Sequence, residues 1–238
     1  MLKYLKTLAF AVCVCALLTS ESRAQNVYEF LFSQSTYTAA NPGDTVPVSV
    51  ILRETVSGGA TARLAPGLDD GLISFAVQTL FGNVTGGPGS TVASAADVTS
   101  NPSPTRFSTD EEIIEVLPTF LNIDSTESSA VAGVVDGLGV NGVLTTPGVY
   151  ELELFDVDFT AGAAGSVTTL ELADLTAFDG FPFFTPTENF FADSLVIDTT
   201  ATFGTSQIVV EGNAVPEPGS LLALGALMMG GMLRRRRS

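Results

Sequence analysis

The chain has 238 residues, with 26 acidic and 10 basic side chains and no histidine, so its formal net charge is −16. Without histidine, a His-based catalytic triad and a His-ligated metal centre are excluded. The acidic balance also excludes nucleic acid as a partner, because phosphate binding needs clustered Lys and Arg.

The first 24 residues have the pattern of a secretory signal peptide. Two lysines precede an apolar run from Leu8 to Leu18, and Ser22-Arg23-Ala24 is a small-x-small cleavage pattern. The apolar run is too short to cross a bilayer of about 30 Å. We therefore expect signal peptidase to cleave between Ala24 and Gln25. Both cysteines lie inside the apolar run, so the mature protein is expected to have neither a disulfide nor a thiol nucleophile.

The body of the chain, Gln25 to Ala214, is strongly acidic. It holds 24 acidic residues, no lysine and only three arginines, for a net charge of −21. Such a surface stays soluble and repels anionic polymers. Acidic turns occur at Asp69-Asp70-Gly71 and Asp136-Gly137, but neither has the spacing of a calcium loop. The sequence therefore predicts no cofactor and no resident metal, and it leaves loose calcium binding open.

Alternating apolar and polar residues along the body predict β-strands. The expected strands are Val46–Leu52, Leu72–Leu80, Tyr150–Phe159, Val167–Leu172, Ser194–Asp198 and Phe203–Glu211. The alternation changes phase at Phe155, which predicts a β-bulge. Only Ser108-Thr109-Asp110-Glu111 has the features of a helix start. Short strands separated by turn signals indicate an all-β chain with a single β-sandwich over residues 25–211.

Two carboxylates of the body are candidates for chemistry. Asp156 and Asp158 would lie about 7 Å apart on one face of a strand, and paired carboxylates serve glycoside hydrolases. Together with Glu151 and Glu153, however, they form a simple acidic outer face. We therefore expect no catalytic residue, and a hydrolase is the less favoured alternative.

A carbohydrate- or protein-binding module is the second alternative. The absence of tryptophan weakens a sugar site, although other aromatic side chains could stack on a sugar ring. These are Tyr28, Tyr37, Tyr150 and the Phe181-Pro182-Phe183-Phe184 cluster.

Residues 212–238 form a short linker and a tail with three parts. Pro216-Glu217-Pro218 keeps the backbone extended. The apolar segment 219–233 would rise about 22 Å as a transmembrane helix. Arg234, Arg235, Arg236 and Arg237 would hold their end in the cytoplasm. A simple tail anchor would need the last two parts but not the prolines.

This order of parts resembles the PEP-CTERM sorting signal, a tail that also carries an ice-binding C-terminal name without implying that it binds ice. The resemblance implies that an exosortase recognises Pro216, Glu217 and Pro218 and removes the tail. The protein would pass through the inner membrane and reach the cell surface or the extracellular polysaccharide matrix of a bacterial biofilm. There a non-catalytic structural or adhesive role is expected, with polysaccharide or a surface protein as partner.

Two stretches of the body resemble a cohesin domain. Pro42–Val50 followed by Gly71–Val77 is similar to the opening strands of that fold, and Gly148–Leu152 with a hairpin from Phe155 to Leu172 is similar to its later strands. The resemblance implies a jelly-roll sandwich used for binding or scaffolding. Dockerin recognition does not follow from it.

Overall fold

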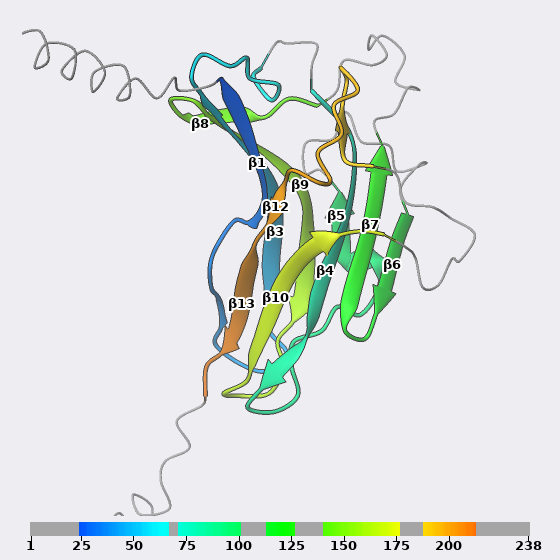
Figure 1. Ribbon diagram of the computed structural model, residues 1–238. Coiled ribbons are helices and arrows are strands. Elements are labelled where there is room, and N and C mark those ends of the chain that lie inside the picture. The colour runs from blue at the N-terminus through cyan, green and yellow to red at the C-terminus, as the bar shows by residue number, and fades with distance from the viewer. Residues whose placement is uncertain (1–23, 67–70, 101–112, 127–139, 177–187, 213–238) are drawn as a thin grey trace, which may run out of the picture.

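The computed structural model describes residues 24–66, 71–100, 113–126, 140–176 and 188–212, which form a sandwich of two β-sheets (Figure 1). Sheet A has the strand order β12-β1-β3-β9-β5, with β8 also paired to β9. Sheet B has the order β2-β13-β10-β4-β7-β6, with β11 also paired to β4. The all-β sandwich predicted from the sequence is confirmed.

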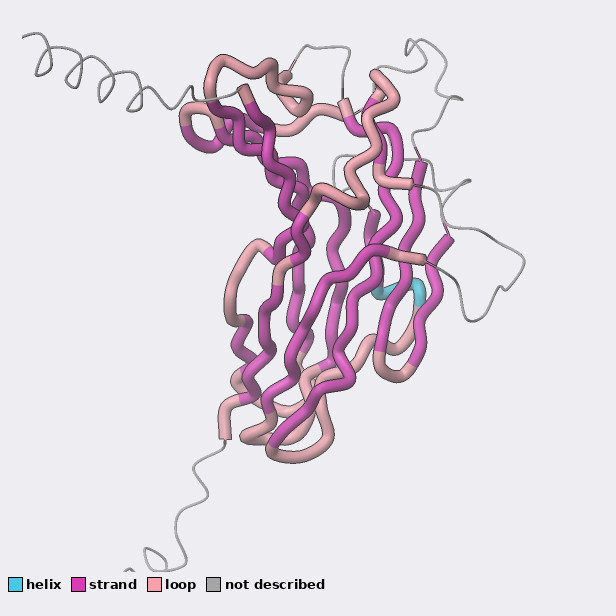
Figure 2. Tube along the Cα trace, viewed as in Figure 1, coloured by secondary structure: helices cyan, strands magenta, loops and turns pink. Residues whose placement is uncertain are grey.

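The strands of sheet A are β1 (Gln25–Phe32), β3 (Thr45–Ser57), β5 (Val98–Ser100), β8 (Val143–Thr146), β9 (Val149–Thr160) and β12 (Thr202–Phe203). Those of sheet B are β2 (Tyr37–Ala39), β4 (Leu72–Thr85), β6 (Ile113–Leu117), β7 (Phe120–Thr126), β10 (Val167–Asp174), β11 (Phe190–Phe191) and β13 (Thr205–Val210). Figure 2 shows a short 3₁₀ turn, η1 (Ala95–Asp97), just before β5.

Aromatic rings join the two sheets in the core. Phe75 of β4 stacks on Phe155 of β9 with ring centroids 6.0 Å apart, and Phe81 meets Phe159 edge-on at 5.3 Å. The inward residues of β3 alternate with less buried ones, as period-2 patterning requires. Three predicted strands are confirmed within β3, β4 and β10: Val46–Leu52, Leu72–Leu80 and Val167–Leu172.

The predicted bulge in β9 is present. Val50 of β3 pairs with Phe155, whereas the next residue, Ile51, pairs with Glu153. Leu154 is thus the extra residue, and both Leu154 and Phe155 are buried. The bulge restores the apolar phase to the core and keeps Glu153 and Asp156 on the outer side of sheet A.

Two predictions about the strands are wrong. Ser194–Asp198 is not a strand, since only Val196 within it is a bridge residue and Ser194 has a left-handed φ of 64°. It lies in the segment 188–201, which is irregular apart from the two residues of β11. The expected hairpin from Phe155 to Leu172 does not exist either, because β9 belongs to sheet A and β10 to sheet B. The turn between them crosses from one sheet to the other. The helix start predicted at 108–111 lies outside the described residues.

The last predicted strand, Phe203–Glu211, is divided at Gly204. The Gly204 N–H donates to the Phe30 carbonyl, and the Gly204 carbonyl accepts from the Leu172 N–H. A Cβ at this position would come within 2.9 Å of the Leu31 side chain, so glycine lets the chain pass from β12 in sheet A to β13 in sheet B.

β1 begins at one end of the sandwich, and β13 finishes at the opposite end (Figure 1). Within the described ranges, no helix has the length and apolar character needed to cross a membrane. The segment 219–233, predicted to be a transmembrane helix, lies outside those ranges.

Candidate functional site

A fully buried carboxylate, Glu54, lies at the end of the sandwich where β1 begins. Its Oε1 accepts hydrogen bonds from Asn26 Nδ2 at 2.8 Å and from the Tyr28 hydroxyl at 3.1 Å. Its Oε2 accepts from the backbone N–H groups of Arg63 and Leu64 at 2.9 and 2.8 Å. A buried carboxylate needs such donors to offset the loss of water. Glu54 therefore ties β1, β3 and the chain after β3 together.

A glycine turn brings the backbone donors to Glu54. Gly58 and Gly59 follow β3 with φ of 62° and 79°, a left-handed conformation that only glycine adopts at little cost. The chain reverses there, so that the N–H groups of Arg63 and Leu64 face back towards β3. Asn26 Nδ2 also donates to the Thr61 carbonyl at 2.7 Å, which fixes the same turn against β1.

The Arg63 side chain extends the cluster to a third part of the chain. Its Nε and Nη2 both contact Asp193 Oδ2, at 2.9 and 2.8 Å, and its Nη1 donates to the Tyr28 hydroxyl at 3.4 Å. Burial alone would lower the pKa of Arg63, but the hydrogen bonds to Asp193 and Tyr28 outweigh it and raise that pKa. Burial and the charge of Glu54 raise the pKa of Tyr28. The arginine stays charged and the tyrosine stays protonated.

Asn189 holds the 188–201 segment to sheet B. The buried Asn189 side chain accepts from the Ala76 N–H at 2.9 Å and donates to the Ala76 carbonyl at 3.2 Å. Its Nδ2 also contacts Asp198 Oδ1 at 2.7 Å and Asp174 Oδ1 at 3.3 Å. Burial and the neighbouring charge of Asp198 raise the pKa of Asp174. The Phe191 ring then packs on Tyr28 at 5.1 Å.

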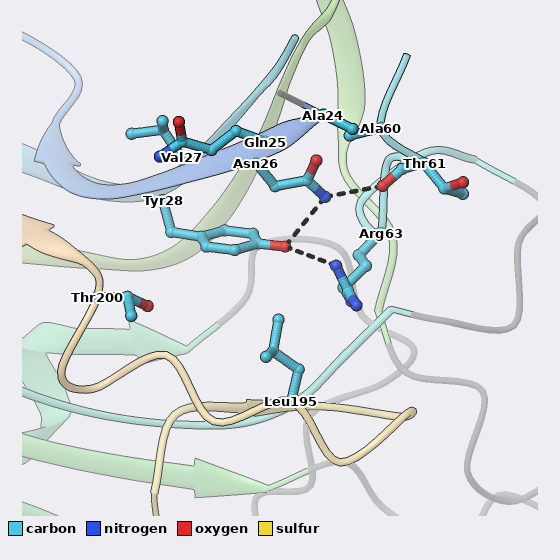
Figure 3. Close-up of a pocket in the computed structure, with 10 residues that line it drawn as sticks. All are labelled: Ala24, Gln25, Asn26, Val27, Tyr28, Ala60, Thr61, Arg63, Leu195 and Thr200. Atoms are coloured by element: carbon cyan, nitrogen blue, oxygen red, sulfur yellow. Dashed lines mark hydrogen bonds between the residues drawn. The ribbon is translucent and has the colours of Figure 1, made fainter. Parts of the chain in front are cut away.

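A groove of about 610 Å³ lies between the start of β1 and this segment. Figure 3 shows the Tyr28 ring and Arg63 between β1 and Leu195, with Thr200 to one side. The groove is lined by Ala24, Gln25, Asn26, Val27, Tyr28, Ala60, Thr61, Arg63, Leu195 and Thr200. Mixed polar and apolar walls with fixed hydrogen-bond donors are typical of a binding site.

Sequence reasoning did not identify Glu54 or this groove. A signal was nevertheless present, since Glu54 continues the inward phase of Val50 and Leu52 along β3. A carboxylate at a core-facing position of a strand needs hydrogen bonds from buried donors. Arg63 carried a weaker signal as one of only three arginines in the body.

The candidate pair Asp156 and Asp158 lies on the outer side of sheet A. Asp156 is partly buried opposite Ser49, and Asp158 is exposed opposite Pro47. Burial, together with the charge of Asp156 and a hydrogen bond to it, raises the pKa of Glu153. The nearby Glu151 is paired with Arg53 at 2.7 Å. Glu151 and Arg53 line a cavity of about 440 Å³, whereas Asp156 and Asp158 are not among the described residues that line it.

The tyrosines proposed as stacking platforms face the core instead. Tyr28 and Tyr37 are buried, and Tyr150 is partly buried against the same core. The burial of Tyr28 and Tyr37 counts against the stacking on sugar rings that the binding-module alternative left open, because the inward phase of their strands covers their faces. The phenylalanine cluster at 181–184 lies outside the described residues.

The predicted sorting residues fall outside the described residues too, as do the acidic side chains of the two turns. These are Pro216, Glu217, Pro218, Arg234–Arg237, Asp69, Asp70 and Asp136. At the predicted cleavage junction, Ala24 is exposed and Gln25 is the first residue of β1. Among the described side chains, no three acidic groups come close enough to hold a metal ion.

Comparison with protein families identifies the tail. Residues 214–237 match the PEP-CTERM protein-sorting motif. The chain carries a PEP-CTERM sorting signal. The predicted resemblance of the tail to a PEP-CTERM sorting signal is thus confirmed, and the signal indicates an exported protein. Among curated proteins no match to the chain was found.

Several solved structures are similar to the body at low identity. The seventh ScaB type I cohesin from Pseudobacteroides cellulosolvens is 10% identical, with a TM-score of 0.43, covering 80% of this chain and 96% of that one. A type I cohesin–dockerin complex from Clostridium thermocellum gives 12% identity, a TM-score of 0.39 and coverages of 77% and 99%. AvmM, described as catalysing macrocyclization in alchivemycin A biosynthesis, is 13% identical with a TM-score of 0.29. The match covers 81% of this chain and 92% of that one. Two of these three structures contain cohesins, and likenesses this distant say nothing of a partner or a reaction.

Proposed function

We propose that this protein is a non-catalytic exported protein that exosortase sorts to the cell surface or the extracellular polysaccharide matrix, where it has a structural or adhesive role. The observation that carries the proposal is the sorting motif at residues 214–237. In the proposed order of events, signal peptidase cleaves after Ala24, the tail pauses in the inner membrane, and exosortase removes it near Pro218.

The described strands support this division of the chain. All of them lie between Gln25 and Val210, so removal of residues 1–24 and of the tail leaves both sheets complete. The body has no cysteine and a closed aromatic core, which supports folding outside the cell without a disulfide. Its net charge of −21 supports solubility in a surface layer.

Replacement of Pro216, Glu217 and Pro218 by three alanines tests the proposal. The substitution leaves the apolar segment and the four arginines unchanged, so a simple anchor would behave as before. We expect the variant to accumulate in the inner membrane at full mature length, while the parent appears shortened at the surface or outside the cell. Fractionation and intact-mass spectrometry measure both properties.

A matched control replaces Gly212 and Asn213 by alanine, just upstream of the motif, and should be processed like the parent. Mass spectrometry of the released parent should find a C-terminus near Pro218 and no arginine-containing tail peptide. If parent and alanine variant fractionate identically with the tail attached, the tail is an ordinary membrane anchor and the sorting proposal is wrong.

A further inference from the structure

The groove at the start of β1 follows the edge of this strand rather than either face. Four consecutive residues of β1, Gln25 to Tyr28, line it, together with Ala24, which precedes the predicted cleavage site. Successive side chains of a strand point to opposite faces of its sheet. Consecutive residues that all border one cavity therefore lie along the edge or at the end of the strand, where backbone groups are presented together with side chains.

The next part of the same edge already accepts a parallel strand. β12 pairs with β1 only at Glu29 and Phe30. The Gly204 N–H donates to the Phe30 carbonyl at 2.8 Å. Because backbone groups alternate along a strand, those of Tyr28 and Asn26 point to the same side as those of Phe30. In the described part of the chain, no strand pairs with residues 24–28 on that side.

The chain itself leaves this edge just before β12. Thr200 and Ala201 both donate to the Ile197 carbonyl, at 3.0 and 2.8 Å, which turns the 188–201 segment away from β1. Leu195 and Thr200 then line the groove (Figure 3).

The charged groups at the groove are paired, within a very acidic body. Among the described residues that line the groove only Arg63 is charged, and the carboxylate of Asp193 pairs with it. The buried Glu54 carboxylate beside them accepts hydrogen bonds from Asn26, Tyr28 and the Arg63 backbone. The body as a whole carries −21, so an acidic ligand would be repelled during approach. An uncharged peptide is not repelled by the negative body. Its backbone also offers regularly spaced donors and acceptors that can pair with the open edge of β1.

We propose that this groove binds an extended, uncharged peptide segment of another protein, which joins sheet A as a strand beside residues 25–28. Main-chain hydrogen bonds to Asn26 and Tyr28 supply affinity in this mode of recognition, and alternate side chains supply specificity. Four residues of β1 correspond to a peptide span of about 13 Å. Small apolar side chains at alternate positions suit the contact with Leu195.

The position of the groove leaves it open to such a partner. It lies at the end of the sandwich opposite to the end of β13 (Figure 1). The sorting motif follows β13 in the chain. The peptide-binding proposal does not depend on exosortase, and either can fail without the other.

Defined peptides test the proposal on the full chain purified in detergent. The probe is acetyl-Thr-Val-Thr-Val-Thr-amide, which is uncharged and alternates small side chains. One control is the same peptide N-methylated at every residue, which removes its backbone donors, and another carries Glu in place of each Thr. We expect only the probe to bind, and amide hydrogen exchange to slow at Asn26 and Tyr28 when it does.

Variants at two neighbouring threonines locate the site. Thr199 and Thr200 are both exposed, but only Thr200 lines the groove. Thr200→Trp should fill the groove and weaken binding of the probe by about tenfold or more. Thr199→Trp should leave the affinity for the probe unchanged. Thr200→Ala removes the bond from Thr200 Oγ1 to the Ile197 carbonyl without filling the space, and it should still bind the probe.

Several results would overturn the proposal. No binding of the probe at millimolar concentration would do so, as would equal binding of the N-methylated or acidic peptide, or protection confined to another strand edge. Protection of Asn26 and Tyr28 that rises with protein concentration in the absence of peptide would show that a second copy of the chain occupies the groove instead.

Discussion

The two ends of the sandwich are built on different interactions. Where β1 begins, Glu54 joins separate parts of the chain by hydrogen bonds to Asn26, Tyr28 and the Arg63 backbone. Where β13 finishes, glycines let loops touch backbone to backbone, as Gly162 does with residues 88–89. The first end therefore depends on charge and donor geometry, and the second on the absence of side-chain volume. Each difference can be tested by substitution.

Glu54→Gln should produce the largest effect. The amide keeps the size of the carboxylate but offers one acceptor oxygen, and its NH2 group faces donors. We expect a loss of about 2–4 kcal/mol in the free energy of unfolding, from charge-assisted bonds lost and buried donors left unpaired. Urea denaturation measures it. Glu29→Gln, on the outer side of sheet A, is the control and should change stability by less than about 0.5 kcal/mol. Equal effects would refute the central role of Glu54.

Gly162→Ala tests the opposite end. A Cβ there would overlap the Pro88 carbonyl and the Gly89 backbone, which have little room to move. We expect a loss of about 1–3 kcal/mol from overpacking, and this loss should not vary with pH because no ionisable group is involved. Gly212→Ala is the control, since nothing lies within 4 Å of its added Cβ. A stable Gly162→Ala variant would show that these loops yield easily.

Two acids at the 188–201 segment, Asp193 within it and Asp174 of β10 beside it, should respond to pH in opposite directions. Burial raises the pKa of Asp193, but its hydrogen bonds to Arg63 and Leu195 outweigh this and lower it below 3.8. The stability that Asp193 contributes is therefore present above that value and lost as pH falls through the lower folded pKa. Asp174 has a raised pKa, so its charge costs stability at neutral pH, and that cost disappears as pH falls through the raised folded pKa.

At pH 7, we therefore expect Asp193→Asn to destabilise the protein and Asp174→Asn to stabilise it. Each change should be about 0.2–1 kcal/mol, because solvent screens both groups. Thermal unfolding followed from pH 7 down to pH 3 measures the two variants against the parent. The Asp174→Asn difference should shrink in acid. Shifts of the same sign at pH 7 would contradict the assignment.

Ser194→Gly should have the smallest effect. Ser194 has a φ of 64°, which costs a residue with a Cβ about 1 kcal/mol. Glycine removes that cost but adds entropy to the unfolded chain, so we expect a net gain of no more than about 0.5 kcal/mol. Thr199→Gly, where no left-handed φ occurs, should instead lose stability. Equal shifts in melting temperature would show that the Ser194 turn is not strained.

The contrast between the bulge and the missing hairpin shows how far sequence patterns reach. The phase change around Phe155 predicted the bulge, because one extra residue must return the apolar side chains to the core. No pattern in residues 161–166 distinguishes a turn within one sheet from a crossing between two. That choice depends on which strands are already beside β9 and β10, namely β3 and β4.

The sequence by itself determined the local properties of this protein: its β-strand periodicity, its acidic surface and the linear sorting motif at residues 214–237. All of them are read from neighbours along the chain. Only the tertiary structure decided where Glu54 found its donors and where an open edge of β1 remained. Both depend on contacts between residues far apart in sequence, such as Arg63 with Asp193, and the pairing of such residues follows from packing the whole core rather than from any local pattern.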